Sequence, residues 1–335
     1  MSGLTLSIIV PARNEEDNIA NCLSSLIDQT FNDYEVIVIS DGSIDKTDEI
    51  TEKYAKTDSR FSLLRVDEKP SGWIGKNYAL FHAQQHAKGT YLLFLDADVV
   101  LNRECIEKTI KILLDNNTDV ISYAAFQKCK SIVEYAVQPL VFYLLNNLYP
   151  LEKISSNNTD VTALNGIFIM LSRKNYDLIG THEALKDKVL EDVEFAKLAK
   201  KCHLKISFSY APHLISVRMY RNFINLYHGW SKNFYPLLNY SNTKTFSISI
   251  ALMLTFYLPL IGEYFWVQYN FIFLSWIIIL FIYFSYVYHK MGYRFYYSFL
   301  YPLGSVILSI IILQSFVNYN FTGNVVWKNR TYKVK

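Results

Sequence analysis

The region from residue 246 to 288 constrains the fold most, because it carries a single formally charged residue, Glu263. It contains the runs ISIALMLTFYLPL and FIFLSWIIILFIYFSYVY, which are longer and more apolar than the buried helices of a small soluble domain. A third apolar run follows at about residues 298–317. We therefore expect a transmembrane region of about three helices over residues 236–320, followed by a basic tail over residues 321–335.

Charge is divided unevenly along the chain. Residues 236–335 hold seven Lys or Arg and one acid, so the excess of positive charge lies wholly in this part. Basic residues beside apolar spans are attracted to anionic lipid headgroups, whereas a nucleic-acid-binding domain would itself be basic. The pattern therefore predicts the membrane as a partner and argues against nucleic acid.

The N-terminal segment offers no long apolar run. LSIIV is followed at once by Pro11 and Arg13, and it is too short for the apolar core of a signal peptide. We therefore expect a multi-pass protein of the cell membrane whose first domain, residues 1–235, faces the cytoplasm.

Residues 1–120 alternate short apolar runs with amphipathic stretches. The runs are LSIIV, YEVIVIS, FSLLRV and TYLLFL, and a helical pattern lies between each two of them. Strands that alternate with helices predict an α/β domain with a parallel sheet and helices on both faces. In such sheets ligands bind beyond the carboxyl ends of the strands, which is where this sequence places its polar clusters.

Asp96 and Asp98 flank a small residue directly after an apolar strand. Both side chains leave the sheet edge together, and Ala97 leaves room between them. Two carboxylates at this spacing suit a hard divalent cation that keeps open positions for phosphate oxygens. A plain turn with two solvated acids has the same sequence, so both interpretations stay open.

Two further clusters precede helical patterns. Asp41-Gly42-Ser43 forms either a plain turn, with Gly42 at positive φ, or a site where an Asp accepts hydrogen bonds from a nucleobase. The segment SGWIGK places Trp73 and Lys76 near a helix start, where Lys76 would add charge to an anion held by backbone amides. A loop anchored by a buried Trp73 is the alternative.

Glu191 and Asp192 open the helical pattern VEFAKLAKK. The helix dipole favours acids there, so simple charge complementation explains the pair, and a general base is the alternative. The two residues are about 100° apart around a helix, so we expect Glu191 to face elsewhere than Asp192. No G-x-S-x-G motif is present, so serine-hydrolase chemistry has no support.

The order of four segments resembles family 2 glycosyltransferases with the GT-A nucleotide-sugar fold. The segments are IIVPARNEEDNI, ISDGSIDKT, LFLDADV and, about a hundred residues later, LEDVEFAKLAKK. SGWIGKNYAL, VRMYRN, HGWSKN and the terminal WKNRTY look like the membrane-attached branch that includes the hopanoid-biosynthesis glycosyltransferases and 4,4'-diaponeurosporenoate glycosyltransferase. The resemblance spans nearly the whole chain.

The resemblance implies roles for individual residues. The nucleobase and ribose of a nucleoside diphosphate sugar, most often a uridine one, would be held by Pro11, Arg13, Glu15 and Asp41. Asp98 would ligate Mn²⁺ or Mg²⁺ directly, and Asp96 would contact the ribose or a metal-bound water. Asp192 would deprotonate the acceptor for an inverting attack, while the metal ion and Lys76 would stabilise the departing diphosphate.

The sequence departs from the family pattern in two places. Ser40-Asp41 stands where many relatives carry two acids, which leaves the ribose contact less defined. A Q-x-x-R-W motif is missing and HGWSKN stands near its expected place, so processive polysaccharide synthesis is disfavoured. Candidates for binding the diphosphate or an anionic acceptor are Trp73, Arg218, Trp230 and Lys232. For Arg218 and Lys232, contact with lipid headgroups is an equal alternative.

The sequence thus predicts a metal-dependent, inverting transfer of one sugar to a membrane lipid, such as a terpenoid or carotenoid hydroxyl or carboxylate. A polyprenyl-phosphate glycosyltransferase is the alternative enzyme, and it would need no general base because its nucleophile is already anionic. A membrane-anchored nucleotide-sugar sensor without turnover is the alternative from another class.

Overall fold

A computed structural model describes residues 5–66, 68–155, 159, 161–265, 270–327 and 330–334. The contacts within the chain divide it into two compact units. Unit 1 is Met1–Phe126 with Tyr149–Arg218, and unit 2 is Gln127–Leu148 with Met219–Lys335. Units defined by contacts need not coincide with functional domains, so the domain boundary expected at residue 235 stays a prediction.

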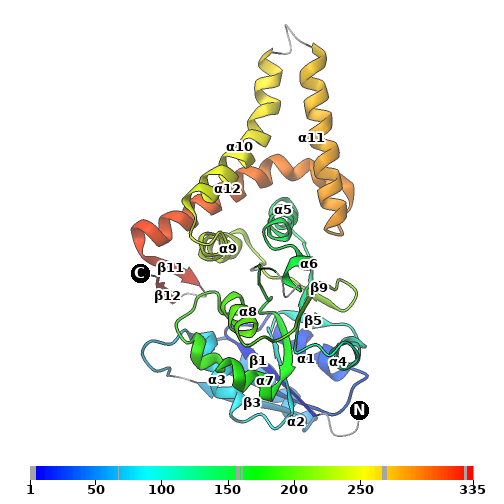
Figure 1. Ribbon diagram of the computed structural model, residues 1–335, viewed down its shortest axis with the longest axis vertical. Helices are drawn as coiled ribbons and strands as arrows, with labels where there is room; N and C mark the ends of the chain where they lie inside the picture. Colours follow the sequence, from blue (N-terminus) through cyan, green and yellow to red (C-terminus); the bar gives the residue numbers. More distant parts are fainter. Residues whose placement is uncertain are drawn as a thin grey trace. The chain divides into compact units, whose positions relative to one another are not determined.

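Unit 1 is built on a seven-stranded mixed sheet with the strand order β3-β2-β1-β4-β8-β6-β9. Figure 1 labels β1, β3 and β9 of this sheet. Its strands are β1 (Leu6–Ala12), β2 (Tyr34–Asp41), β3 (Phe61–Val66), β4 (Tyr91–Leu95), β6 (Val120–Ala124), β8 (Phe168–Ser172) and β9 (Ile206–Tyr210). The strands β1 to β4 are parallel, which confirms the α/β pattern expected for residues 1–120. β8 runs antiparallel to both β4 and β6, so the sheet is not parallel throughout.

Three short strands lie outside this sheet in the same part of the chain. They are β5 (Val99–Leu101), β7 (Phe126–Gln127) and β10 (Ile215–Val217). β5 and β10 pair in antiparallel orientation, with Val99 opposite Val217. This pairing ties the segment that follows Asp98 to the end of unit 1.

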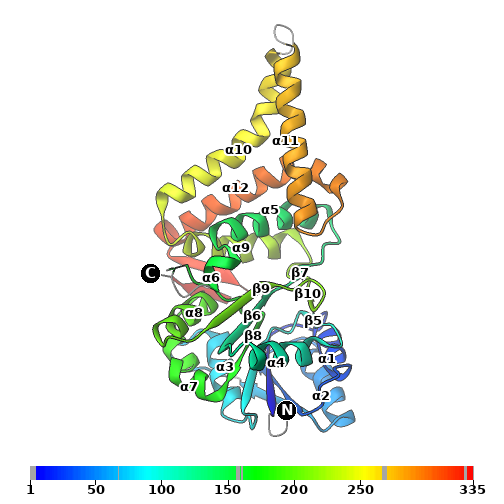
Figure 2. The same ribbon diagram turned by 45° about the vertical axis from the view of Figure 1, so that its right-hand side comes forward.

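Helices cover both faces of the main sheet, as expected from the sequence. They are α1 (Ile19–Ile27), α2 (Thr47–Thr57), α3 (Gly75–Gln84), α4 (Cys105–Asp115), α6 (Leu151–Ile154), α7 (Arg173–Ile179), the 3₁₀ helix η1 (His182–Leu185) and α8 (Glu191–Lys201). Figure 2 shows α3, α7 and α8 on one side of the sheet and α1, α2 and α4 on the other. α1 buries Ile19, Cys22, Leu23 and Leu26, which is the spacing of an amphipathic helix.

Arg173 fastens the start of α7 to the turn that leads into β4. Its guanidinium donates hydrogen bonds to three backbone carbonyls, those of Gly89 at 3.1 Å, Ala87 at 2.7 Å and Gln84 at 3.4 Å. We expect Arg173→Ala to lower the free energy of unfolding by about 1–2 kcal/mol, because charged hydrogen bonds are lost at a partly buried site. Thermal unfolding would measure the change, with exposed Lys174→Ala as the control. Equal stability of both variants would contradict this role.

Unit 2 is mostly helical. Its elements are α5 (Ile132–Leu148), α9 (Phe223–Leu237), α10 (Asn242–Phe265), α11 (Asn270–Lys290), η2 (Phe295–Leu300), α12 (Tyr301–Val317), the π-helical turn η3 (Asn318–Thr322), β11 (Asn324–Trp327) and β12 (Arg330–Lys333). α12 packs closely on α5, since a Cβ added at Gly304 would lie 2.0 Å from the carbonyl oxygen of Ala136. Only a glycine lets these two backbones come so near.

The structure supports fewer membrane spans than the sequence predicts. Within the described part of the chain, one helix, Phe295–Thr322, is long and apolar enough to cross a membrane, and 44% of its most apolar stretch is buried inside the protein. The other two predicted spans correspond to α10 and α11. Residues 266–269 between them lie outside the described residues, and these two spans stay predictions.

Candidate functional site

The polar clusters singled out in the sequence meet at one edge of the unit 1 sheet. β2, β1 and β4 are parallel neighbours, so their carboxyl ends lie side by side. Arg13 follows β1, Asp41 ends β2, and Asp96 follows β4. The strand order therefore brings together residues that are far apart in the sequence.

Arg13 and Asp41 contact each other. The guanidinium Nη1 of Arg13 donates to the backbone carbonyl of Asp41 at 2.7 Å and lies 3.7 Å from its carboxylate Oδ2. Asp41 is 7% exposed, so this pair is well shielded from solvent. Pro11 lies within β1, opposite Ile39 of β2, two residues before Arg13.

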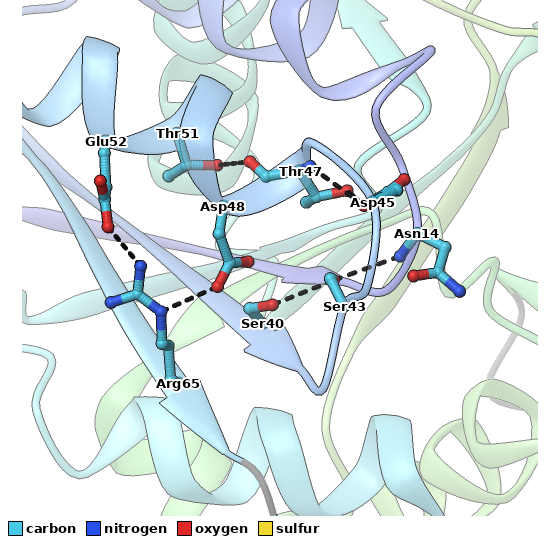
Figure 3. A network of polar contacts seen from close by, with 9 residues as sticks. All are labelled: Asn14, Ser40, Ser43, Asp45, Thr47, Asp48, Thr51, Glu52 and Arg65. Carbon is cyan, nitrogen blue, oxygen red and sulfur yellow. Dashed lines mark hydrogen bonds and ion pairs between the residues drawn. The ribbon is translucent and has the colours of Figure 1, made fainter.

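Side chains join the loops that follow β1 and β2 (Figure 3). The backbone N–H of Asn14 donates to Ser43 Oγ at 3.2 Å, and Asn14 Oδ1 accepts from the backbone N–H of Ile44 at 3.0 Å. Asn14 has φ of 51°, and Gly42 has φ of 60°. The Glu15 N–H donates to Thr47 Oγ1 at 2.7 Å. The turn expected at Gly42 is thus cross-linked to the loop that carries Arg13 and Glu15.

Lys76 lies between two carboxylates. Its Nζ is 2.8 Å from Asp96 Oδ1 and 2.9 Å from Glu191 Oε1. Burial lowers the pKa of Lys76, but the charges of Asp96 and Glu191 more than offset this and hold the pKa well above its ordinary value. Burial raises the pKa of Asp96, and Lys76 reduces that rise. Lys76 therefore stays protonated and binds together the end of β4 and the start of α8.

The neighbouring residue in α3, Asn77, fixes the position of Lys76. Asn77 is fully buried, and its Nδ2 donates to the carbonyls of Leu185 at 2.6 Å and Lys188 at 3.0 Å. The backbone N–H of Ile74 donates to Lys186 O at 2.7 Å. The start of α3 is therefore pinned to the segment that leads into α8. Asn77 was not predicted from the sequence, because nothing in its local pattern indicates a contact with residues more than a hundred positions away.

Asp192 is held by two backbone amides at the same place. Its Oδ2 accepts from the N–H of Gly166 at 3.1 Å, and its Oδ1 accepts from the N–H of Val193 at 2.8 Å. Burial, with a smaller contribution from the charge of Glu191, raises the pKa of Asp192 to about 6. A carboxylate with this pKa is ionised at neutral pH and accepts a proton more readily than an ordinary aspartate.

Gly166 lies beside Lys76, Glu191 and Asp192 and was not predicted as a site residue from the sequence. A Cβ added there would lie 3.2 Å from Glu191 Oε1 and 3.4 Å from Lys76 Nζ. The absence of a side chain leaves room for these charged groups to meet beside Asp192. The dipeptide Asn165-Gly166 directly before an apolar strand was the available signal.

The expectation that Glu191 faces elsewhere than Asp192 is wrong, since Glu191 is paired with Lys76. The rotation of about 100° separates the directions of the two Cβ atoms, not the ends of the side chains. The longer Glu191 side chain reaches Lys76, whose charge also acts on Asp192. Both acids therefore belong to the same site.

Asp98 lies near other carboxylates at the end of β4. Burial raises the pKa of the Cys22 thiol, and the charges of Asp98, Glu15 and Asp96 add to this rise, which places all three acids near Cys22. The described residues include no group of three or more His, Cys, Asp or Glu side chains arranged to hold a metal ion. Two carboxylates nevertheless fit Mg²⁺ or Mn²⁺, because these ions accept one or two protein carboxylates when phosphate oxygens and waters complete the coordination. Asp96 and Asp98 are suited to this arrangement.

Trp73 precedes α3, and Arg218 follows β10, whose Val217 lies opposite Val99 of β5. The Trp73 ring packs against Tyr78, with ring centroids 5.4 Å apart, and against Phe81 at 5.0 Å. The ring therefore anchors its loop to α3. Arg218 is the last residue of unit 1 and is partly exposed. A diphosphate or acceptor contact by either residue stays a prediction.

Trp230 and Lys232 belong to α9 of unit 2. Trp230 is 3% exposed, and its Nε1–H donates to Gln138 Oε1 at 2.9 Å. The indole is thus part of the interior of unit 2, with its polar atom satisfied there. Lys232 is partly exposed, and its backbone carbonyl accepts from Tyr319 OH at 3.0 Å. Ligand contacts by these two residues also stay predictions.

Comparison with known proteins identifies relatives of this chain. Residues 7–179 match the family described as glycosyl transferase family 2. The 4,4'-diaponeurosporenoate glycosyltransferase of Staphylococcus haemolyticus is 27% identical over 240 residues, which are 68% of this chain and 60% of that protein. The enzyme of the same name from Staphylococcus aureus strain USA300 is 27% identical over 233 residues, with the same two shares. The chain thus spans about 60% of the length of the curated relatives that it matches.

A solved structure shares the fold. The mannosyltransferase from Pyrobaculum calidifontis, in complex with GDP-Man and Mn²⁺, superposes with a TM-score of 0.56 at 16% sequence identity. The match covers 95% of this chain and 88% of that protein.

Proposed function

Because the chain belongs to glycosyl transferase family 2 and has the GT-A fold, we propose that it transfers a single sugar from a nucleoside diphosphate sugar to a membrane lipid. The transfer is metal-dependent and inverts the anomeric carbon, and the donor is a uridine diphosphate sugar. The observation that carries this proposal is the cluster of Lys76, Asp96, Glu191 and Asp192 at the carboxyl end of β4. This cluster combines the fixed ammonium group of Lys76 with the carboxylate of Asp192, which is suited to accept a proton.

The donor nucleotide lies against the loops after β1 and β2. Arg13 and Asp41 hold each other in a shielded position, and Glu15 is fixed through its backbone contact with Thr47. Together with Pro11, these side chains form a preformed edge for the nucleobase and ribose. The rigid cross-links of the two loops support this role.

Asp98, with Asp96 beside it, would hold Mn²⁺ or Mg²⁺, which when bound neutralises the negative charge of the diphosphate leaving group. The Mn²⁺ in the related mannosyltransferase structure supports this choice of cofactor. Lys76 supplies a second, permanent positive charge within 2.8 Å of Asp96. Positive charge fixed in advance near a leaving group stabilises its departure without reorganisation during the reaction.

Asp192 acts on the acceptor. The N–H groups of Gly166 and Val193 orient its carboxylate, which takes the proton from the attacking acceptor hydroxyl. The acceptor oxygen forms a bond to the anomeric carbon, the bond from that carbon to the diphosphate oxygen breaks, and the nucleoside diphosphate leaves. The raised pKa of Asp192 favours an acceptor hydroxyl, which must lose a proton, over a carboxylate or a polyprenyl phosphate, which are already anionic.

The lipid acceptor and the membrane location are supported by two observations. The relatives carry the name of a diaponeurosporenoate glycosyltransferase, and Phe295–Thr322 is long and apolar enough to span a membrane. On this proposal the protein is a multi-pass protein of the cell membrane, residues 1–235 face the cytoplasm, and the acceptor arrives from the bilayer.

Nucleotide release tests the proposed function. We expect the full chain, purified with Mn²⁺ and a panel of uridine diphosphate sugars, to release nucleotide at a rate that rises at least about tenfold when a membrane lipid extract is added. Mass spectrometry should then find a lipid heavier by one sugar. Release that is independent of lipid would contradict the lipid acceptor, and no release with any donor would favour a sensor without turnover.

A further inference from the structure

The ion pairs of Lys76 connect two parts of the site that are far apart in the sequence. Asp96 follows β4, and Glu191 begins α8, next to Asp192. In the proposed reaction the first part serves the donor and the second serves the acceptor. The proposed reaction itself assigns no role to Glu191.

The geometry points to Glu191 as a positioning residue for the transfer: it holds the Lys76 ammonium against Asp96, and its charge acts on the neighbouring Asp192. This inference rests on the proposed function and adds a residue to the same site. Glu191 touches neither the donor nor the acceptor in this scheme.

The space around Glu191 is arranged for this ion pair. The side chain of Glu191 is 15% exposed, and its Oε1 lies 2.9 Å from Lys76 Nζ. Gly166 leaves the gap in which the two groups meet, because a Cβ there would lie 3.2 Å from that same oxygen. Since Asn77 pins the start of α3, Lys76 has a fixed base from which to reach both acids.

Two ionisable side chains act on Asp192: Glu191 lies on the same helix, and Lys76 comes from α3. Tyr149, which precedes α6, faces Asp192 as well, and the charge of Asp192 raises the pKa of this phenol, which is neutral where Asp192 titrates. His182 interacts with Glu191 and Lys76, but burial lowers its pKa to about 3, so it contributes no charge at neutral pH. Glu191 is a negative side chain beside Asp192, and its charge raises the pKa of Asp192.

The direction in which the pKa of Asp192 changes when the charge of Glu191 is removed follows from the neighbouring charges. Glu191→Gln takes away a neighbouring negative charge and leaves the positive charge of Lys76 less compensated. Both changes favour the ionised form of Asp192, so its pKa falls. Because the base must be ionised to act, the low-pH limb of the kcat profile moves to lower pH. A residue with a merely structural role would leave the position of this limb unchanged.

The test compares the wild type with Glu191→Gln, Lys76→Met and the double variant in the full chain. We expect the Glu191→Gln limb to move down by about half a pH unit or more and the plateau kcat to fall about tenfold, with the KM for the donor little changed. The double variant should be no slower than Lys76→Met alone, since Glu191 acts through Lys76. The control is Glu194→Gln in the same helix, whose partner is Lys197 at 2.6 Å, and it should keep the wild-type profile.

The outcomes separate this inference from the proposed function. An active wild type with an unshifted Glu191→Gln limb, or with additive losses in the double variant, overturns the role of Glu191 alone. A wild type that transfers no sugar overturns the proposed function. In that case titration of the Asp192 carboxyl by ¹³C NMR, assigned with Asp192→Asn, decides the matter without activity. A lower midpoint in Glu191→Gln supports the inference, and an equal midpoint overturns it.

Discussion

Asp192→Asn is expected to lower kcat for sugar transfer by at least about 100-fold while the affinity for the donor stays nearly unchanged. The amide keeps the shape of the side chain and its contact with the N–H of Gly166, but it cannot take a proton. Rates under saturating donor and a separate donor-binding titration would measure both quantities. Asp177→Asn, an exposed acid on α7, is the matched control.

The same carboxylate predicts how the wild type depends on pH. Burial raises the pKa of Asp192 to about 6, so below about pH 6 the carboxyl is mostly protonated and cannot act as a base. The rate should therefore rise with pH through about 6 and level off above it, and the Asn variant should lack this rise. If Asp192→Asn transfers sugar at nearly the wild-type rate, Asp192 is not a general base. The acceptor would then be already anionic, such as a carboxylate or a polyprenyl phosphate.

Asp98→Ala is expected to reduce transfer by about 10³-fold, because the charge that develops on the diphosphate would lose its main electrostatic partner. Thermal unfolding should show the fold intact, since Asp98 lies in the turn between β4 and β5. Activity measured with Mn²⁺, with Mg²⁺ and with a chelator would establish the dependence on metal. Asp115→Ala, exposed at the end of α4, serves as the control.

Full activity of the wild type in chelator would contradict the metal requirement directly. An Asp98→Ala variant that needs much more Mn²⁺ but reaches the wild-type rate would instead assign Asp98 to metal affinity alone. Both results are distinguishable by titrating the metal into each protein.

Local sequence patterns predicted the residues that meet at the ends of β1, β2 and β4 better than the contacts around the start of α8. Arg13, Asp41 and Asp96 each follow a short apolar strand, and parallel strands bring such residues to one edge. The short apolar run that marks each of these strands is visible in a few residues. The antiparallel direction of β8 could not be predicted in the same way, because strand direction depends on the path of the chain and not on the local run of apolar residues.

Contacts between segments that are distant in the sequence explain why the predictions for other residues of the site failed. Glu191 was expected to face elsewhere because a helical wheel considers only its own helix, whereas Lys76 of α3 decides where the side chain goes. Gly166 and Asn77 were not predicted because their contacts are with residues of other elements: Gly166 leaves room beside Glu191 and Lys76, and Asn77 donates to the carbonyl of Leu185. The apolar runs near the C-terminus predicted helices correctly, but apolar composition alone does not distinguish a membrane span from a buried helix.

The reversed direction of β8 has a consequence for how specificity can change. The end of β4 and the beginning of β8 lie at the same edge, and the N–H of Asp96 donates to the carbonyl of Ile167 at 3.1 Å. The chain thus enters β8 beside the point where it leaves β4. Segments before Gly166 can vary in length and side chains while this one strand pair keeps the acid after β4 in register. In the proposed reaction, a change in the incoming segment would accommodate a new acceptor and leave the proposed donor site after β4 in place.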